Sequence, residues 1–260
     1  MENNYTYDEC IEIIKDKICT IATAGVKHSG KSTLGEYIKN NKGHIELAFA
    51  DGIKGILECA LHMSKDQLHD QSLKEKIDKF WNHSPREFLK AIGTEMFQDK
   101  FMELFPDIGR EIWARSVALK MVKLYIKDPY NNKFVITDVR FKHEVDFLNK
   151  IGATIIRINR PSVETKIDSH RSESDIKNLK VDHEINNDSN MENMYSQFDE
   201  LYNKVMPPKR TSHNFNETYI HYKQIASKYL YDKPSYNLVF GLSVLSAVLL
   251  TDKCMYRNNK

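Results

Sequence analysis

Residues 25–32 read GVKHSGKS and satisfy the pattern G-x-x-x-x-G-K-[ST], the Walker A pattern. They follow the β-branched run ICTIAT at residues 18–23, which predicts a buried strand, and they precede residues 32–40, whose spacing is helical. In this context glycines let successive backbone N–H groups point inward at a helix N-terminus and form a nest for anions. The stretch therefore predicts a loop that binds a nucleotide polyphosphate, and an ordinary tight turn is the alternative.

Two side chains of this loop carry the chemistry that the pattern predicts. Lys31 would supply a mobile cation to the β- and γ-phosphates. The hydroxyl of Ser32 could ligate Mg²⁺.

Composition excludes several classes of protein. The 260 residues include 38 Lys and Arg against 36 Asp and Glu, a formal net charge of +2, which predicts no nucleic-acid binding through bulk charge. The cysteines are far apart in the sequence and form no CxxC pair, which argues against a zinc site or a disulfide scaffold. The first ten residues lack an apolar secretory core, so we expect a cytoplasmic protein.

Further strands and helices alternate along the chain. Residues 45–49, 134–137 and 154–158 are predicted strands, and helical spacing recurs over residues 51–63, 84–97, 113–124 and 145–151. Ser84, Pro85 and Glu87 form a predicted helix start. Such alternation predicts an α/β fold with a parallel β-sheet flanked by helices on both faces.

The predicted strand that ends in Thr137 is followed by Asp138 and Arg140. Parallel strands deliver their carboxyl ends to the edge where the phosphate loop lies. Asp138 would then lie near Mg²⁺ or the attacking phosphate, and Arg140 near an anionic ligand. The alternative is a helix-capping aspartate beside a surface arginine.

The chain changes character after Leu201. Residues 207–212 read PPKRTS, which is typical of a linker, so we place a domain boundary between residues 1–206 and an extension at 207–260. Residues 238–250 form an uncharged apolar segment, and a helix of that length spans about 20 Å against roughly 30 Å of bilayer hydrocarbon. We expect this segment to pack on the main domain or on a partner, and membrane association is the weaker alternative.

With these residues in hand, the chain resembles the deoxynucleoside monophosphate kinases of bacteriophages and other DNA viruses. The resemblance covers about residues 18–205 and rests on Trp113 and on GVKHSGKST at 25–33, GIK at 52–54, SPREFLKAIGTE at 84–95, ITDVRFKHEVD at 136–146, GATIIRINRP at 152–161, DSHRSE at 168–173 and INND at 185–188. It implies a P-loop kinase fold with a helical substrate-binding insertion and a lid. It also implies phosphorylation of deoxynucleoside 5′-monophosphates to diphosphates with ATP and Mg²⁺.

The resemblance implies a role for each matching residue. Lys54, Arg86 and Arg140 would bind the monophosphate acceptor, and Lys31, Asp138 and Arg140 would be catalytic. A lid at about residues 160–175 would carry Arg160, His170 and Arg171. The loop would bind ATP through Gly25, Lys27, Ser29, Gly30, Lys31, Ser32 and Thr33, with Ser32 as the metal ligand.

The chain departs from the family in two places. Relatives often have Asp after the loop lysine, where this chain has Ser32, the standard Walker A residue. The tail beyond Pro207 has no counterpart in compact members.

Two other functions remain open at this level. One is a P-loop kinase of another small phosphorylated acceptor, with animal phosphomevalonate kinase as the nearest rival. The other is a non-catalytic nucleotide-binding protein. The sequence also leaves open which base is accepted, whether the chain forms a homodimer, and whether its location is the cytoplasm of a virus-infected host.

Overall fold

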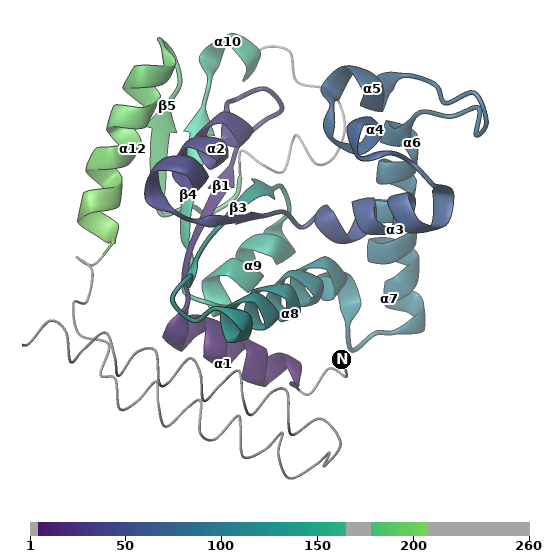
Figure 1. The fold of residues 1–260 in the computed structure, drawn as a ribbon, viewed down its shortest axis with the longest axis horizontal. Helices are drawn as coiled ribbons and strands as arrows, with labels where there is room; N and C mark the ends of the chain where they lie inside the picture. Colours follow the sequence, from purple (N-terminus) through teal and green to yellow (C-terminus); the bar gives the residue numbers. More distant parts are fainter. Residues whose placement is uncertain (1–4, 165–177, 207–260) are drawn as a thin grey trace, which may run out of the picture. The chain divides into compact units, whose positions relative to one another are not determined.

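The computed structural model describes residues 5–164 and 178–206, without the side chains of residues 163 and 164. Strands and helices alternate along the chain, except for a run of helices between β2 and β3 (Figure 1). The strands are β1 Cys19–Ala24, β2 Ile45–Leu47, β3 Lys133–Val139, β4 Thr154–Asn159 and β5 His183–Asn186. The helices are α1 Tyr7–Lys17, α2 Lys31–Lys42, α3 Asp51–Leu61, α4 Lys65–His69, α5 Gln71–Glu75, α6 Pro85–Lys90, η1 Ala91–Lys100, α7 Phe101–Leu104, η2 Gly109–Glu111, α8 Ile112–Lys127, α9 Lys142–Lys150, α10 Pro161–Glu164 and α12 Met191–Val205.

The five strands form one sheet in the order β2-β3-β1-β4-β5, and every neighbouring pair is parallel. Strand β1 is central, between β3 and β4, so the loop that follows it opens at the carboxyl edge of the sheet. This confirms the predicted α/β class, the parallel sheet and the phosphate loop between a strand and a helix.

Alternate residues of the strands face two separate layers. Ala22, Ile136 and Ile155 belong to the core that α1, α8 and α9 cover. Ile21, Val135 and Ile156 are also buried but lie outside that core cluster, on the other face of their strands, where α2 packs on β3 and contacts α12. The sheet therefore carries helices on both faces, as predicted.

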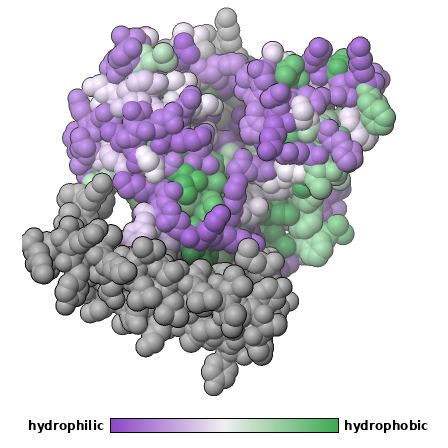
Figure 2. All heavy atoms as spheres, viewed as in Figure 1, coloured by the Kyte–Doolittle hydropathy of each residue, from purple (hydrophilic) through white to green (hydrophobic). Residues whose placement is uncertain are grey.

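The segment between β2 and α8 is the helical insertion that the resemblance implied. Its helices α3 to α7 lie together on the side of the sheet away from α12 (Figure 1). Figure 2 shows mostly hydrophilic surface over α2 and over α4–α6.

Strand β2 and the helix predicted over residues 84–97 differ from the prediction. Strand β2 stops at Leu47 instead of residue 49, because the backbone N–H groups of Phe49 and Ala50 donate to Asp138. The helix predicted over residues 84–97 begins as expected, with a capping box between Ser84 and Glu87. It changes at residue 91 from an α-helix into the wider π-helix η1, whose Gly93 carbonyl accepts a hydrogen bond from the indole N–H of Trp113.

Strand β5 was not predicted. Its sequence, His-Glu-Ile-Asn, is polar, and Ile185 is its buried residue. A short edge strand of this kind carries too little hydrophobic pattern to be recognised from sequence.

By its contacts the chain divides into Met1–Val205 and Met206–Lys260. Apart from Met206, the second unit lies outside the described residues, and so does the apolar segment 238–250. The domain boundary and the role of the tail stay predictions. No helix of the described residues is long and apolar enough to cross a membrane.

We predict that acid destabilises the fold through His44. This side chain is buried, its Nδ1 lies 3.1 Å from the carbonyl oxygen of Phe134, and its Nε2 lies 3.2 Å from the hydroxyl of Tyr202. Burial lowers the pKa of His44 to about 4 from 6.5, so the folded state holds the neutral ring. The unfolded chain binds the proton first, and stability present above pH 6.5 is lost as the pH falls toward 4, by at most about 1.4 kcal/mol per pH unit.

Denaturant unfolding at pH 7.5, 6.5 and 5 measures this dependence. Between pH 6.5 and 5, the free energy of unfolding should fall less steeply with pH for His44→Gln than for the unmodified chain, whatever the stability of the variant at pH 7.5. An unchanged slope would show that His44 does not titrate in this range.

Candidate phosphate-transfer site

The loop between β1 and α2 has a backbone that glycine makes possible. Gly25 has φ 148° and Gly30 has φ 111°, both in the region that side chains rarely adopt. A Cβ atom on Gly25 would also lie 2.7 Å from the carbonyl oxygen of Ile158 in β4, and one on Gly30 would lie 2.6 Å from Nδ2 of Asn187. The backbone angles of the loop therefore favour glycine at both positions, and Ile158 and Asn187 leave little room for a side chain there.

Lys31 is folded back over this loop. Its side chain is 9% exposed, and its Nζ donates to the carbonyl oxygens of Gly25 at 2.5 Å and Val26 at 2.6 Å. The ammonium thus lies at the mouth of the loop, where a polyphosphate could exchange for these carbonyls. Ser29 is fully buried in the same loop, and no described group forms a hydrogen bond with its hydroxyl. A lysine held by exchangeable carbonyls and an unpartnered hydroxyl fit a loop that receives phosphate oxygens.

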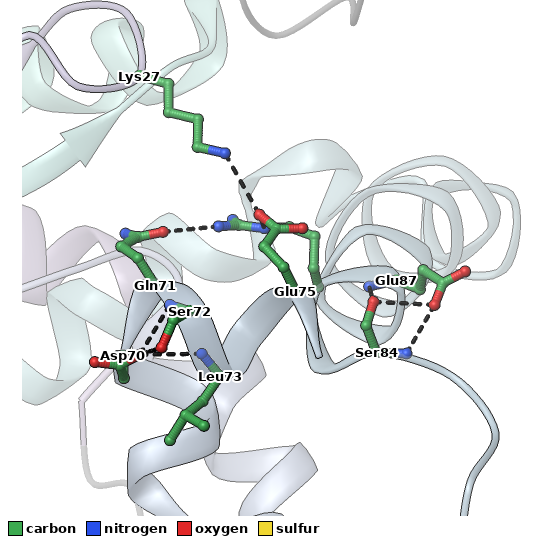
Figure 3. Close-up of polar contacts among 9 residues, drawn as sticks. Lys27, Asp70, Gln71, Ser72, Leu73, Glu75, Ser84 and Glu87 are labelled. Carbon is green, nitrogen blue, oxygen red and sulfur yellow. Dashed lines mark hydrogen bonds and ion pairs between the residues drawn. The ribbon is translucent and has the colours of Figure 1, made fainter. Parts of the chain in front are cut away.

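The other predicted loop residues are open to ligands. Ser32 is exposed and Thr33 half-buried in the first turn of α2. Lys27 is exposed, and its Nζ lies 3.4 Å from Oε1 of Glu75 in α5 (Figure 3). Within residues 5–164 and 178–206, no three His, Cys, Asp or Glu side chains gather to hold a metal ion. Ser32 is therefore the described loop group that fits Mg²⁺, whose remaining ligands would be phosphate oxygens and water.

Two side chains from the ends of β4 and β5 hold the outer side of the loop. Nδ2 of Asn187 donates to the carbonyl oxygen of Ser29 at 2.8 Å, and Nη1 of Arg160 lies 3.2 Å from the carbonyl oxygen of His28. The backbone N–H of Asn187 in turn donates to the carbonyl oxygen of Asn159 at 2.8 Å. The carbonyls of the loop are thereby engaged on its outer side.

Arg160 was predicted as a lid residue, and the structure describes it in contact with the phosphate loop. The other predicted lid residues, His170 and Arg171, lie outside the described residues. Asn187 was not among the predicted site residues, although it lies in the INND stretch that carried the resemblance. No property of that stretch alone indicated that its amide would reach a loop 158 residues earlier.

Asp138 holds the start of the insertion. Its Oδ1 accepts from the N–H of Phe49 at 2.8 Å, and its Oδ2 accepts from the N–H of Ala50 at 2.9 Å. Burial raises the pKa of Asp138, and these two hydrogen bonds act in the opposite direction. Ala50 caps α3, and its carbonyl oxygen accepts from the N–H of Lys54 at 3.0 Å. Asp138 therefore fixes the turn that carries Lys54, a predicted acceptor-binding residue.

Glu144 holds the backbone at Arg140 through similar hydrogen bonds. The carboxyl group of Glu144, 4% exposed, accepts from the N–H groups of Arg140 at 2.7 Å and Phe141 at 3.0 Å. Burial and the nearby charge of Asp138 raise the pKa of Glu144 to about 8. Sequence analysis missed this residue, although its place three residues after Phe141 at a helix start is the signal of a capping carboxylate.

The predicted acceptor residues belong to a group of cations from separate elements. Arg86, in the first turn of α6, donates from Nε to Oε1 of Glu75 at 3.1 Å and from Nη2 to Oε1 of Gln71 at 3.0 Å. Lys74 of α5 is buried, and its pKa falls to about 8 because of burial and the charges of Lys54, Arg86 and Arg140. The charges of the three predicted acceptor-binding cations thus all act on a fourth cation, Lys74, that no sequence pattern indicated.

Comparison with known sequences gives a consistent set of relatives. A sequence model of the deoxynucleotide monophosphate kinase family matches residues 69–198. A protein of Acanthamoeba polyphaga mimivirus, assigned as a deoxynucleotide monophosphate kinase, is 33% identical over 180 residues, which are 68% of this chain and 92% of the relative. The deoxynucleotide monophosphate kinases of Escherichia phage RB69 and Enterobacteria phage T4 are 28% and 27% identical over 134 and 123 residues. Those matches cover 50% and 46% of this chain and about half of each phage protein, 50% and 45%.

Solved structures are more distant. The dephospho-CoA kinase from Campylobacter jejuni is 18% identical with a TM-score of 0.41, over 72% of this chain and 96% of that one. TT1252 from Thermus thermophilus is 12% identical with a TM-score of 0.41, over 74% of this chain and 100% of that one.

We predict that Asn187→Ala raises the KM for ATP about five-fold, since one neutral hydrogen bond to the loop contributes about 1 kcal/mol. The KM for the acceptor should change less than two-fold, because Asn187 contacts the loop carbonyl of Ser29. Initial-rate kinetics with each substrate varied in turn measure both constants. Asn131→Ala, an exposed position before β3, is the control, and an equal rise in both KM values would contradict a role confined to the loop.

Proposed function

Because this chain belongs to the deoxynucleotide monophosphate kinase family, we propose that it transfers the γ-phosphate of ATP to a deoxynucleoside 5′-monophosphate, giving ADP and the deoxynucleoside diphosphate. The observation that carries the proposal is one shared edge of the sheet. There the loop with Lys31 follows β1, Arg140 follows β3, and Lys54 and Arg86 come from the insertion beside them.

The donor side of the proposal rests on the loop. Lys31 would leave the carbonyls of Gly25 and Val26 and bind the β- and γ-phosphates of ATP, while the loop N–H groups bind the phosphate oxygens. Lys27, Ser29 and Thr33 would complete this donor site. When bound, Mg²⁺ would offset charge on the same phosphates, with the exposed hydroxyl of Ser32 as its ligand from the chain.

The acceptor side rests on the cations of the insertion. In the transfer, an oxygen of the acceptor phosphate attacks the γ-phosphorus, the bond to the bridging oxygen of ADP breaks, and ADP leaves. A dianionic acceptor has no proton to lose, so the step requires no general base. Both reactants are negatively charged, and Lys54, Arg86 and Arg140 would offset their repulsion and hold them in line.

In this mechanism Asp138 acts as a positioning residue. Both of its carboxylate oxygens accept hydrogen bonds from the turn before α3. This favours a role in orienting Lys54 over the direct contact with Mg²⁺ or substrate that the sequence suggested.

Two alternatives remain for experiment to separate. A kinase of another phosphorylated acceptor, such as phosphomevalonate, would use the same donor loop. A non-catalytic nucleotide-binding protein is disfavoured by the family, whose named members are kinases.

The test is a substrate panel of the four deoxynucleoside monophosphates, their ribose forms and phosphomevalonate, each with ATP and Mg²⁺. We expect diphosphate formation from at least one deoxynucleotide. Turnover of phosphomevalonate alone would establish the first alternative, and ATP binding without any transfer would establish the second.

We predict that Lys31→Met lowers kcat at least 100-fold, because it removes a charge aimed at the transferring phosphate. The melting temperature should change by less than about 4 °C, equivalent to roughly 1 kcal/mol for a domain of this size. Steady-state kinetics and thermal unfolding measure the two effects. Lys39→Met, an exposed position on the same helix, is the matched control, and near-normal turnover of the Lys31 variant would remove this residue from the mechanism.

We also predict that a chain ending at Met206 keeps the KM values and kcat of the full chain within about two-fold, since all described site residues precede this position. Expression of both forms and parallel assays measure this. An insoluble or inactive product would show that residues 207–260 belong to the catalytic fold.

A further inference from the structure

Lys74 is an unusual lysine for a short surface helix. The residue is 8% exposed, whereas most lysines are largely exposed. No described side chain or carbonyl oxygen accepts a hydrogen bond from its ammonium, and the residue contributes only its backbone N–H, to the carbonyl oxygen of Asp70. The alkyl stem of Lys74 is therefore buried while its ammonium reaches solvent, where a ligand can approach it.

The charges around Lys74 disfavour its protonated form. Lys54 of α3, Arg86 of α6 and Arg140 after β3 all act on it with the same sign. The nearby acid is Asp70, whose Oδ1 accepts from the N–H and hydroxyl of Ser72 and from the N–H of Leu73 (Figure 3). That carboxylate is engaged at the N-terminus of α5 and does not bond to Lys74.

The contacts of Arg86 explain how these cations come together. Gln71 and Glu75 are one turn apart on α5, and Lys74 lies on the same face, because residues three and four apart are neighbours on a helix. Arg86 bonds to both Gln71 and Glu75, so its guanidinium lies beside Gln71, the helix neighbour of Lys74. The carboxylate of Glu75 forms ion pairs with Arg86 and Lys27. This part of α5 has an ammonium without a carboxylate partner among the described residues, and a guanidinium held close by, which is an arrangement that a phosphate dianion completes.

We propose that Lys74 binds the 5′-phosphate of the acceptor nucleotide, a dianionic phosphate monoester, together with Lys54, Arg86 and Arg140. The proposal rests on the function inferred above and adds to the acceptor site a residue that no sequence motif marks. Bound phosphate would give the Lys74 ammonium the acceptor oxygens that the described residues do not provide.

A coupling between phosphate binding and protonation follows. The pKa of Lys74 is about 8, lowered by burial first and then by Lys54, Arg86 and Arg140, with Asp70 acting in the opposite sense. A bound dianion favours the charged form and raises this pKa, so the protein takes up a proton on binding. Around pH 8, where half of the free protein holds neutral Lys74, about half a proton should be taken up for each acceptor bound.

Other titratable groups near Lys74 must be separated from this effect. His69, at the end of α4, has its pKa lowered by burial and by the charges of Lys54 and Lys74, so it is neutral above pH 7. The pKa values of Asp70 and Glu75 lie below their ordinary range, so both stay ionised. In the range from pH 7.5 to 9.5, Lys74 is therefore the group of this set that changes charge.

The experiment compares the full chain with Lys74→Met, Lys74→Arg and the exposed control Lys79→Met. At pH 7.5 we expect Lys74→Met to raise the KM for the acceptor at least ten-fold while the KM for ATP stays within two-fold. The acceptor KM of the unmodified chain should rise between pH 8 and 9.5. Lys74→Arg, which is charged throughout, should keep a low acceptor KM and lose this rise.

Isothermal titration calorimetry with dGMP and dTMP, in buffers of different ionisation enthalpy at pH 8, counts the protons directly. The unmodified chain and Lys79→Met should take up about half a proton, and both Lys74 variants none. A Lys74→Met variant with an unchanged acceptor KM or unchanged proton uptake would overturn the proposal. Thermal unfolding identifies a variant that has failed to fold, and Lys74→Arg then carries the test.

The calorimetry also distinguishes failure here from failure of the proposed function. If the chain binds dGMP or dTMP with Lys74-dependent proton uptake but transfers no phosphate, Lys74 remains a phosphate-binding residue and the kinase reaction is wrong. If it transfers phosphate with no effect of Lys74 on acceptor binding, the reaction stands and the role of Lys74 is wrong.

Discussion

The central position of β1 is the constraint on which the rest of the site depends. Because β1 pairs with β3 on one side and β4 on the other, the loop after it must turn into α2 between the ends of two neighbouring strands. Gly25 lies against the backbone of β4, and no larger residue fits there. The other neighbour of β1 is β3, which carries Asp138 near its carboxyl end and is followed directly by Arg140. Both residues therefore lie at the edge of the sheet where the loop begins. One register in the sheet thus fixes the donor loop and one side of the acceptor site together.

Neighbouring cations repel each other, and two buried carboxylates of this protein fix the backbone segments that carry Lys54 and Arg140. We call these pairs of carboxylate–backbone hydrogen bonds backbone clamps. Asp138 and Glu144 each accept two backbone N–H groups, and the first fixes the turn before Lys54 while the second fixes the backbone of Arg140. A carboxylate that accepts two backbone N–H groups fixes the backbone that carries a cation without requiring an ion pair with the cationic side chain. This arrangement explains why buried acids and a cation cluster occur together at the same edge.

The parts of the site that the sequence could predict are local. The loop with Lys31, the residues after a strand end such as Asp138, and the helix start at Ser84 follow from patterns of a few residues. Lys74 and Asn187 could not be predicted, because their roles depend on contacts between elements far apart in sequence. Nothing in the residues around Lys74 indicates that its stem is buried or that the charge of Arg86 acts on it, and nothing around Asn187 indicates that it reaches the loop after β1.

The contact between the donor loop and the insertion is weaker than the contacts within either. Lys27 and Arg86 share one oxygen of Glu75, and that carboxylate is half-exposed, so water and salt screen both pairs. The buried clamps at Asp138 and Glu144 are not screened in this way. Buried hydrogen bonds thus hold the backbone at Asp138 and Glu144, whereas the ion pairs of Glu75 are exposed and can be exchanged for other anions. Phosphoryl transfer requires such a combination, because fixed charges must align two phosphates whose arrival displaces whatever held the cations before.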